Sequence, residues 1–383
     1  MLDFSFTEEQ IMTQKTMRDF SEKELLPRYQ QHDKTEIFPS DLWEKMSELG
    51  LMGLRIPEEY GGNPVDYVTL GLIIKELSRG DPNCAQFTVL PILSEIVFNH
   101  ASKEVKDEWL PLLASGKKKI ALGVSEPHCG SDVSAMKAKA VKKGDYYYLN
   151  GEKSGISFMM NCDALILYAI TDPDAKTGGI SSFFVPMNLP GVNRSSYKDM
   201  GEKLIMRGSV FLDDVKISEK YRLGEEGKGF YQAMSTFDVL RLCLCMVALG
   251  AAEKSIEETI EYVKIREAFG KPLAKFEGVS FPLVEHYTKL MSAHWLCFQA
   301  LWAHNKGLKH TKETAMCKYY TPQIAVQAIH ECLLLHGHYG YTKDFPMEQR
   351  LRDIIALEFA DGTAQIQKII VTRELMGKEY LPY

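Results

Sequence analysis

Hydrophobic residues recur at helical spacing in two long regions, one at each end of the chain. From residue 6 to about residue 115, apolar positions return every three or four residues; within residues 39–51 one such stripe consists of Leu42, Met46 and Leu49. The helical period returns after Gly227 and continues almost to the C-terminus, in segments at residues 229–269, 276–307, 312–336 and 350–376. Four long helices joined by short links predict an antiparallel bundle.

Short runs of β-branched and aromatic residues separate the two helical regions. They lie at residues 146–149, 164–169, 181–185 and 210–212, between turns rich in Gly, Pro and Asp. This pattern predicts a small β domain, and we place the three domains at residues 1–118, 119–222 and 223–383. The order of helices, sheet and helices, together with the absence of GxGxxG, disfavours a βαβ unit that binds NAD.

Composition narrows the class of protein further. The 383 residues are 45% hydrophobic and 25% charged, and the net charge of -6 is spread along the chain. A nucleic-acid surface would need clustered Lys and Arg. The longest apolar stretch, residues 240–252, is interrupted by Arg241 and falls short of the roughly 20 residues that cross a bilayer, which predicts a buried helix.

The N-terminus and the cysteines bear on the cellular compartment. The first ten residues carry acids where a leader peptide carries Lys or Arg, so we expect a cytoplasmic protein. The eight cysteines form no CxxC pair, which favours reduced thiols over disulfides. Because HExxH is also absent, we expect no metal site.

The segment LGVSEPHCGSD at residues 122–132 is the first with the chemistry of a ligand site. Its glycines, Gly123 and Gly130, and its hydroxyls, Ser125 and Ser131, would let a flat ligand lie close to the backbone and accept hydrogen bonds. A plain turn between strands explains this segment equally well.

Four further motifs favour the ligand site. They are FDVLR at residues 237–241, REAFGKPL at 266–273, HGHYGYT at 336–342 and RDIIALEFADGTAQIQ at 352–367. In their order and spacing the chain resembles the acyl-CoA dehydrogenases, flavin-dependent enzymes that desaturate acyl-CoA thioesters next to the carbonyl. The resemblance covers nearly the full length and implies an N-terminal helical domain, a middle β-barrel-like domain, a C-terminal four-helix bundle and FAD as cofactor.

The resemblance also implies site residues in this chain. The flavin ring would lie against Leu122, Val124, Ser125, Ile156 and Ser157, with Gly130 and Ser131 beside it. The acyl-CoA would contact Ser131, Asp238, Arg241 and Gly362. Thr363 and Gln365 match contacts to the flavin diphosphate at a helix N-terminus. The positions that reach FAD from a neighbouring subunit are Arg266, Phe269, Gly270, Glu277 and Gly337. Glu277 and His338 depart from the family's usual Gln and Gly, which puts their contacts in doubt.

Structural interpretations of the same residues stay open. Arg266 and Arg241 could be solvated, and Asp238 could pair with Arg241 at helical spacing. Phe269 and Tyr341 could belong to the core. Ser125 and Ser157 could be ordinary turn and strand hydroxyls.

Asp361 is the residue expected to act as the catalytic base. The resemblance implies a carboxylate that removes the Cα proton while a hydride leaves Cβ for flavin N5, with the thioester carbonyl held partly by the backbone N–H of the base. The family's motif YEGT reads ADGT here, so the aligned base is Asp361, and the alternative family position holds Leu240. Asp361 could instead cap the following helix.

An Asp base and two small residues suggest the shape of the substrate. Asp is one methylene shorter than Glu, and Gly155 and Ala360 stand where many relatives carry Trp and Tyr. We therefore expect a wide, short pocket for a bulky acyl group such as cyclohexane-1-carbonyl-CoA, by analogy with anaerobic bacterial enzymes of alicyclic metabolism. A relative that removes hydrogens across a 1,4 relation uses an N-terminal Asp, which the stretch FTVLPILSE lacks.

Three other functions remain open beside acyl-CoA dehydrogenation. The chain could be an enoyl-CoA reductase, a 1,4-dehydrogenase of a cyclohexene ester, or an acyl-CoA-binding protein without catalysis. The resemblance implies a homotetramer that passes electrons to an electron-transferring flavoprotein.

Overall fold

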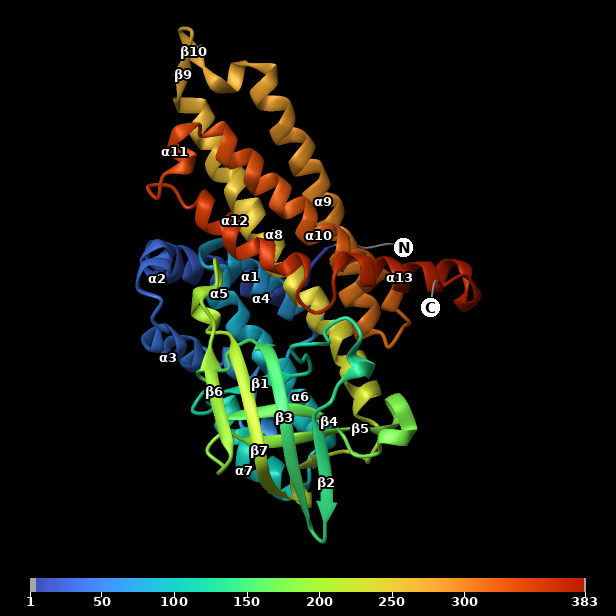
Figure 1. Cartoon of the computed structure of the whole chain (residues 1–383). Helices are drawn as coiled ribbons and strands as arrows, with labels where there is room; N and C mark the ends of the chain where they lie inside the picture. The colour runs from blue at the N-terminus through green and yellow to red at the C-terminus, as the bar shows by residue number, and fades with distance from the viewer. Residues whose placement is uncertain (1–4, 382–383) are drawn as a thin grey trace.

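A computed structural model describes residues 5–381 of the chain (Figure 1). The N-terminal region is helical, as predicted. Its helices are α1 Glu8–Phe20, α2 Tyr29–Thr35, α3 Ser40–Glu48, α4 Tyr67–Gly80, α5 Pro82–Ala85, α6 Leu90–His100 and α7 Lys103–Ala114. In α3 the predicted stripe holds for Leu42 and Met46, which are fully buried, and is wrong for Leu49. Leu49 follows the last turn of α3, just before Gly50 turns the chain with a φ of 75°, and its side chain is 45% exposed.

The middle region forms the predicted β domain. Its strands are β1 Ile120–Gly123, β2 Lys139–Lys143, β3 Tyr146–Ile156, β4 Ala164–Ile170, β5 Ile180–Pro186, β6 Val192–Ser196, β7 Gly208–Ser218 and β8 Arg222–Leu223. They pair in the order β6-β7-β3-β2-β4-β5-β8, and β1 joins β4 in parallel. All four predicted strands lie within β3, β4, β5 and β7. Alternate side chains of the sheet form a core of their own, separate from the core of the helices.

The C-terminal region begins with three long helices, α8 Gly229–Ile265, α9 Glu277–Asn305 and α10 Thr311–Leu335. A short hairpin of β9 Glu267–Ala268 and β10 Lys271–Pro272 joins α8 to α9 at the end of the bundle far from the sheet (Figure 1). The apolar stretch at residues 240–252 lies inside α8, as predicted. By length and composition α8 alone among the described helices could cross a membrane, but 72% of its most apolar window is buried within the molecule, which is typical of a core helix.

The single fourth helix predicted at residues 350–376 is wrong. The structure has a short α11 His338–Tyr341, then α12 Met347–Ile355, a 3-10 turn Ala356–Glu358 and α13 Ala364–Met376. The break lies where Asp361 and Gly362 adopt φ values of 53° and 104°, which a helix does not allow. The hydrophobic period continues across the break, so the pattern alone did not reveal it. We call residues 359–363 the α12–α13 loop.

A buried polar joint ties the N-terminal helices to α12 and to the β6–β7 connection; its members are Tyr29, His32, Asp81, Asn83 and Asp353. Asp353 accepts hydrogen bonds from the Tyr29 hydroxyl (2.7 Å), the Asn83 amide (2.9 Å) and the backbone N–H of Glu202 (2.6 Å). Burial raises the pKa of Asp353 to about 7.

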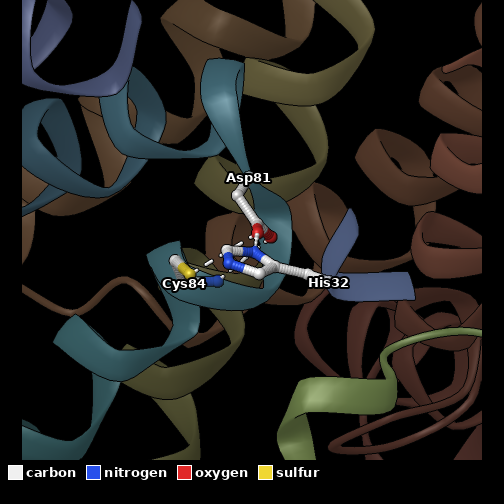
Figure 2. Close-up of side chains that lie close together, drawn as sticks. All are labelled: His32, Asp81 and Cys84. Carbon is white, nitrogen blue, oxygen red and sulfur yellow. Dashed lines mark hydrogen bonds and ion pairs between the residues drawn. The ribbon is translucent and has the colours of Figure 1, made fainter. Parts of the chain in front are cut away.

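The other end of the joint brings together His32, Asp81 and Cys84, which point toward one another (Figure 2). Nδ1 of His32 lies 2.8 Å from Oδ2 of Asp81, whose other oxygen caps α5 by accepting from the N–H of Asn83 and of Cys84. Burial raises the pKa of the Cys84 thiol well above its usual value. Because Asp81 both caps α5 and holds His32, we assign this cluster a structural role.

Candidate functional site

Two cavities that share lining residues lie between the β domain, helix α8 and the α12–α13 loop. The outer cavity measures about 760 Å³ and the inner one about 150 Å³. Both are lined by residues of three segments that the sequence singled out: Val124 and Ser125 after β1, Ser157 after β3, and Ala360 and Asp361 of ADGT. The fold thus brings the segment after β1 and the ADGT segment, far apart in sequence, to one site.

The β wall of the site is held by a buried ion pair. Nζ of Lys153 on β3 lies 2.8 Å from Oε1 of Glu126 and donates a hydrogen bond to the carbonyl of Val124 (2.9 Å). Glu126 also accepts from the backbone N–H of Lys137 and of Ala138. These contacts fix the backbone of the LGVSEPHCGSD segment, so that its small residues face the cavities.

Most of the residues predicted to lie against the flavin ring are found on this wall. Leu122 lines the inner cavity, Val124, Ser125 and Ser157 line both, and Gly130 and Ser131 line the outer one. The structure does not bring the side chain of Ile156 to either cavity, because alternation along β3 buries it in the core of the sheet. Within the described residues, the hydroxyls of Ser125 and Ser157 make no hydrogen bond, which leaves them free for a ligand.

Gly155 opens the wall between the two cavities. Its φ is 65°, and a Cβ built on it would meet no other atom within 4 Å. Its N–H donates a hydrogen bond to the Tyr197 hydroxyl (3.2 Å). On the opposite side Ala360 lines both cavities. Both residues therefore place little or no side chain at the site, and a wide pocket stays a prediction.

The α12–α13 loop is held by its backbone carbonyls. Nε of Arg241 donates to the carbonyl of Asp361 (2.9 Å), and the amide of Gln367 donates to that of Gly362 (3.2 Å). Lys318, a buried residue of α10, donates to the carbonyl of Leu357 (2.7 Å). Glycine is favoured at position 362, because its φ of 104° strains any residue with a Cβ. The loop is thus positioned without any use of the Asp361 side chain.

Asp361 lines both cavities. Among the described residues, no group donates a hydrogen bond to this carboxyl, and its backbone N–H has no acceptor. Burial raises the pKa of Asp361, and the positive charges of Lys318 and Arg241 oppose this rise. The alternative role of Asp361 as a helix cap is wrong, because the side chain of Thr363 caps α13 by accepting from the N–H of Ile366.

The outer cavity collects the residues predicted to contact acyl-CoA. Ser131, Asp238, Arg241 and Gly362 line it, and so does Thr363, which was predicted to contact the flavin diphosphate. The proposed pairing of Asp238 with Arg241 is present at 3.2 Å, and the hydroxyl of Thr311 also donates to Asp238 (2.8 Å). Arg241 is buried, so the solvated alternative is wrong for this residue. The sequence analysis missed Thr311 and Arg373 on this cavity, since neither belongs to a motif.

The inner cavity has an apolar side and a polar corner. Val89, Leu90 and Leu93 of the α6 region face Leu240 and Leu244 of α8. The polar corner consists of Gln86, Glu202 and Arg207, none of which the sequence analysis named. One signal in the sequence could have pointed to two of them. Glu202 and Arg207 are charged residues next to Gly201 and Gly208, in the segment between β6 and β7.

The remaining predicted residues lie away from both cavities. Arg266, Phe269 and Gly270 are exposed at the β9–β10 hairpin, and Glu277, Gly337, His338 and Gln365 are exposed on the helices or at their starts. The core interpretation is wrong for Phe269 and Tyr341, which are 95% and 84% exposed. The solvated interpretation of Arg266 fits this single chain.

Comparisons with known proteins agree with this arrangement. Three family models match consecutive parts of the chain: the N-terminal domain of acyl-CoA dehydrogenase at residues 7–117, the middle domain at 121–215 and the C-terminal domain at 227–376. A subunit of the caffeyl-CoA reductase-Etf complex of Acetobacterium woodii is 33% identical, over 97% of this chain and 100% of that protein.

Solved structures show the same fold. Butyryl-CoA dehydrogenase from Megasphaera elsdenii superposes with a TM-score of 0.94 at 30% identity, covering 98% of this chain and 100% of the other. A structure described as an FAD complex of PigA superposes with a TM-score of 0.93 at 25% identity, with the same coverage.

Proposed function

This chain belongs to the acyl-CoA dehydrogenase family, and on that premise we propose that it desaturates the α,β bond of a bulky acyl-CoA thioester with Asp361 as the base. One observation carries the proposal: a carboxyl without a hydrogen-bond donor faces a large cavity on a loop that is held only through its backbone. An acid held in this way is free to exchange a proton with a ligand.

FAD is the cofactor of this family, and the residues of the site suit it. The outer cavity has a wall of small residues with unpaired hydroxyls, Ser125, Ser131 and Ser157, which can donate to a flat heterocycle. The N-terminus of α13, where Thr363 and Gly362 line the cavity, offers N–H groups for phosphate. When bound, FAD supplies the acceptor for the electrons that leave the substrate.

The protein residues handle the proton and the carbonyl. Asp361 removes the Cα proton, which the thioester carbonyl makes acidic. The free N–H of Asp361 donates to the carbonyl oxygen and stabilises the negative charge that develops there. Arg241, Lys318 and Gln367 position both groups by fixing the loop carbonyls.

The acyl group is proposed to be alicyclic, with cyclohexane-1-carbonyl-CoA as the example. Gly155 and Ala360 give width, and the shorter base suits a Cα that lies close to the loop. No carboxyl of the stretch at residues 87–95 lines either cavity, since the side chains facing them are Val89, Leu90 and Leu93. The 1,2 reaction is therefore favoured over a 1,4 reaction that uses an acid from this stretch.

Reduction of an enoyl-CoA is the second proposed function. The name of the Acetobacterium relative describes a reductase. The raised pKa of Asp361 supports this direction too, because an acid that holds its proton more tightly can deliver it to Cα.

We further propose that the enzyme is a cytoplasmic homo-oligomer, a tetramer by family resemblance, and that an electron-transferring flavoprotein is its partner. The exposed Arg266, Phe269, Gly270, Glu277 and Gly337 would then complete the FAD site of a second copy. The Etf complex of the relative supports this partner.

Anaerobic titration of the purified protein with straight, branched and alicyclic acyl-CoA esters tests the proposal. The expected result is a yellow protein whose flavin absorbance bleaches with the alicyclic esters and bleaches less with straight ones. A colourless protein that binds acyl-CoA would instead support the non-catalytic alternative. Bleaching by NADH and re-oxidation by an enoyl-CoA would favour the reductase.

A further inference from the structure

The polar corner of the inner cavity lies where it can contact the acyl group. It consists of Gln86, Glu202 and Arg207. Gln86 and Glu202 line the inner cavity and not the outer one, whereas Arg207 lines both. Gln86 lies on the same side as Val89, Leu90 and Leu93, which form the apolar wall of that cavity. The corner therefore lies beside the apolar wall, in a cavity that Ser125, Ser157 and Asp361 also line.

The chain holds this corner in place at a conformational cost. Glu202 and Met206, on either side of the 3-10 turn Lys203–Ile205, have φ values of 51° and 46°. Left-handed residues other than glycine are strained and persist where the surroundings fix them. Asp353 of the polar joint fixes Glu202 by accepting from its N–H. Lys203 secures the same turn through Glu36, at 2.8 Å.

The side chains of the corner have hydrogen-bonding capacity left over. Oε1 of Glu202 accepts from the Gln86 amide at 2.8 Å. Its Oε2 lies 3.6 Å from Nη1 of Arg207, too far for a hydrogen bond. Arg207 donates through Nε to Asp199 at 2.9 Å, and its Nη atoms make no hydrogen bond to the described residues. An acceptor on Glu202 and donors on Arg207 thus face the same cavity.

We infer that the acyl group of the substrate carries a neutral hydroxyl that donates to Glu202 and accepts from Arg207, which makes these two residues the determinants of acyl specificity. The inference rests on the proposed function. A carboxylate substituent would meet the carboxyl groups of Glu202 and Asp361; burial, and after it the charges of Asp199 and Asp361, raises the pKa of Glu202. An ammonium group would meet Arg207 and Arg241, whereas a hydroxyl satisfies both members of the corner.

A binding titration tests the inference. The probe protein is the FAD-loaded Asp361→Asn variant, which binds esters without reacting, and the ligands are cyclohexane-1-carbonyl-CoA and its 3-hydroxy and 4-hydroxy derivatives. We expect at least one hydroxy ester to bind at least about tenfold more tightly than the unsubstituted ester, because a site built to hydrogen-bond a hydroxyl rejects the analogue without it. Equal or weaker binding of both hydroxy esters would overturn the inference.

Variants of the corner provide the second arm. Adding Glu202→Leu or Arg207→Met should bring the binding ratio close to one, and the matched control Glu225→Gln, an exposed acid, should leave it unchanged. A ratio that persists in both corner variants would overturn the inference. The inference would also be overturned if the corner variants changed the flavin absorbance and left the binding ratio unaltered. That result would assign the corner to FAD. Because the titration measures binding alone, failure of the wild type to bleach would contradict the proposed reaction without affecting this ratio.

Discussion

Asp353 and Asp361 lie close in sequence, one at the end of α12 and the other in the α12–α13 loop, and burial raises the pKa of both. Their surroundings differ in what they offer the carboxyl. Asp353 accepts three hydrogen bonds in the polar joint, from Tyr29, Asn83 and Glu202. Among the described residues Asp361 receives none on its side chain, and its loop is held by its carbonyls.

The difference separates a structural acid from a reactive one. An acid surrounded by donors holds other groups in place, and its removal leaves those donors unpaired. An acid whose support lies entirely in the backbone can change protonation without disturbing the fold. Burial alone does not distinguish the two residues, since it raises both pKa values; the hydrogen bonds do.

The largest expected effect concerns Asp361. Asp361→Asn should slow flavin reduction by an acyl-CoA about 100- to 10,000-fold, the usual contribution of a general base. Because Asn also tolerates the left-handed region, the backbone should stay as it is. Anaerobic stopped-flow absorbance measures the rate. FAD content and melting temperature should match the wild type, and unchanged reduction would place the base elsewhere.

Asp353 should show the opposite pattern. Asp353→Ala leaves three buried donors without an acceptor, which should lower the free energy of unfolding by about 2–4 kcal/mol. Urea unfolding followed by circular dichroism measures the loss. A variant as stable as the wild type would show that the joint does not support the fold, and the comparison between the two acids would fail.

Lengthening the base should sharpen the role of Asp361. Asp361→Glu extends the carboxyl by one methylene, and a misplacement of about 1 Å can cost about a hundredfold in rate. We therefore expect reduction by a straight-chain ester to become roughly 10- to 100-fold faster, and reduction by the alicyclic ester to slow. The ratio of the two rates in one preparation is the readout. A fall with both esters would contradict the shortened-base explanation.

The smallest expected effect is a pH dependence of stability at the joint. The pKa of Asp353 is raised to about 7 in the folded chain, above the 3.8 of an ordinary Asp, so the folded state binds this proton more tightly. The resulting stability is present at low pH and is lost as pH rises through about 7. Between pH 6 and pH 8 the wild type should lose about 1.4 kcal/mol relative to Asp353→Asn. Parallel unfolding curves at both pH values check this, and an equal loss in both proteins would contradict it.

The sequence predicted the fold class well because each region has a distinct hydrophobic period. The strands at β3, β4, β5 and β7 and the helices α8, α9 and α10 follow from local pattern. The break between α12 and α13 did not, since the apolar period runs through it and only two φ values, at Asp361 and Gly362, record it.

The site divides in the same way. Residues within motifs, such as Ser125, Arg241 and Asp361, were named in advance and line the cavities. Gln86, Glu202 and Arg207 were not, because they come from separate elements and only tertiary packing gathers them. Lys318 was missed for a related reason: its target is a backbone carbonyl, which carries no side-chain signal.

The backbone conformation of Gly155 restricts which substitutions can occur at this position during evolution. Because its backbone is left-handed, any larger residue placed there by a single substitution would cost roughly 1–2 kcal/mol, even though the space beside it is open. A lineage that acquired this glycine could not easily return to a bulky aromatic at the same position without first rebuilding the strand end, including the hydrogen bond to Tyr197. The broad pocket is therefore expected to be retained among descendants even when their substrates change.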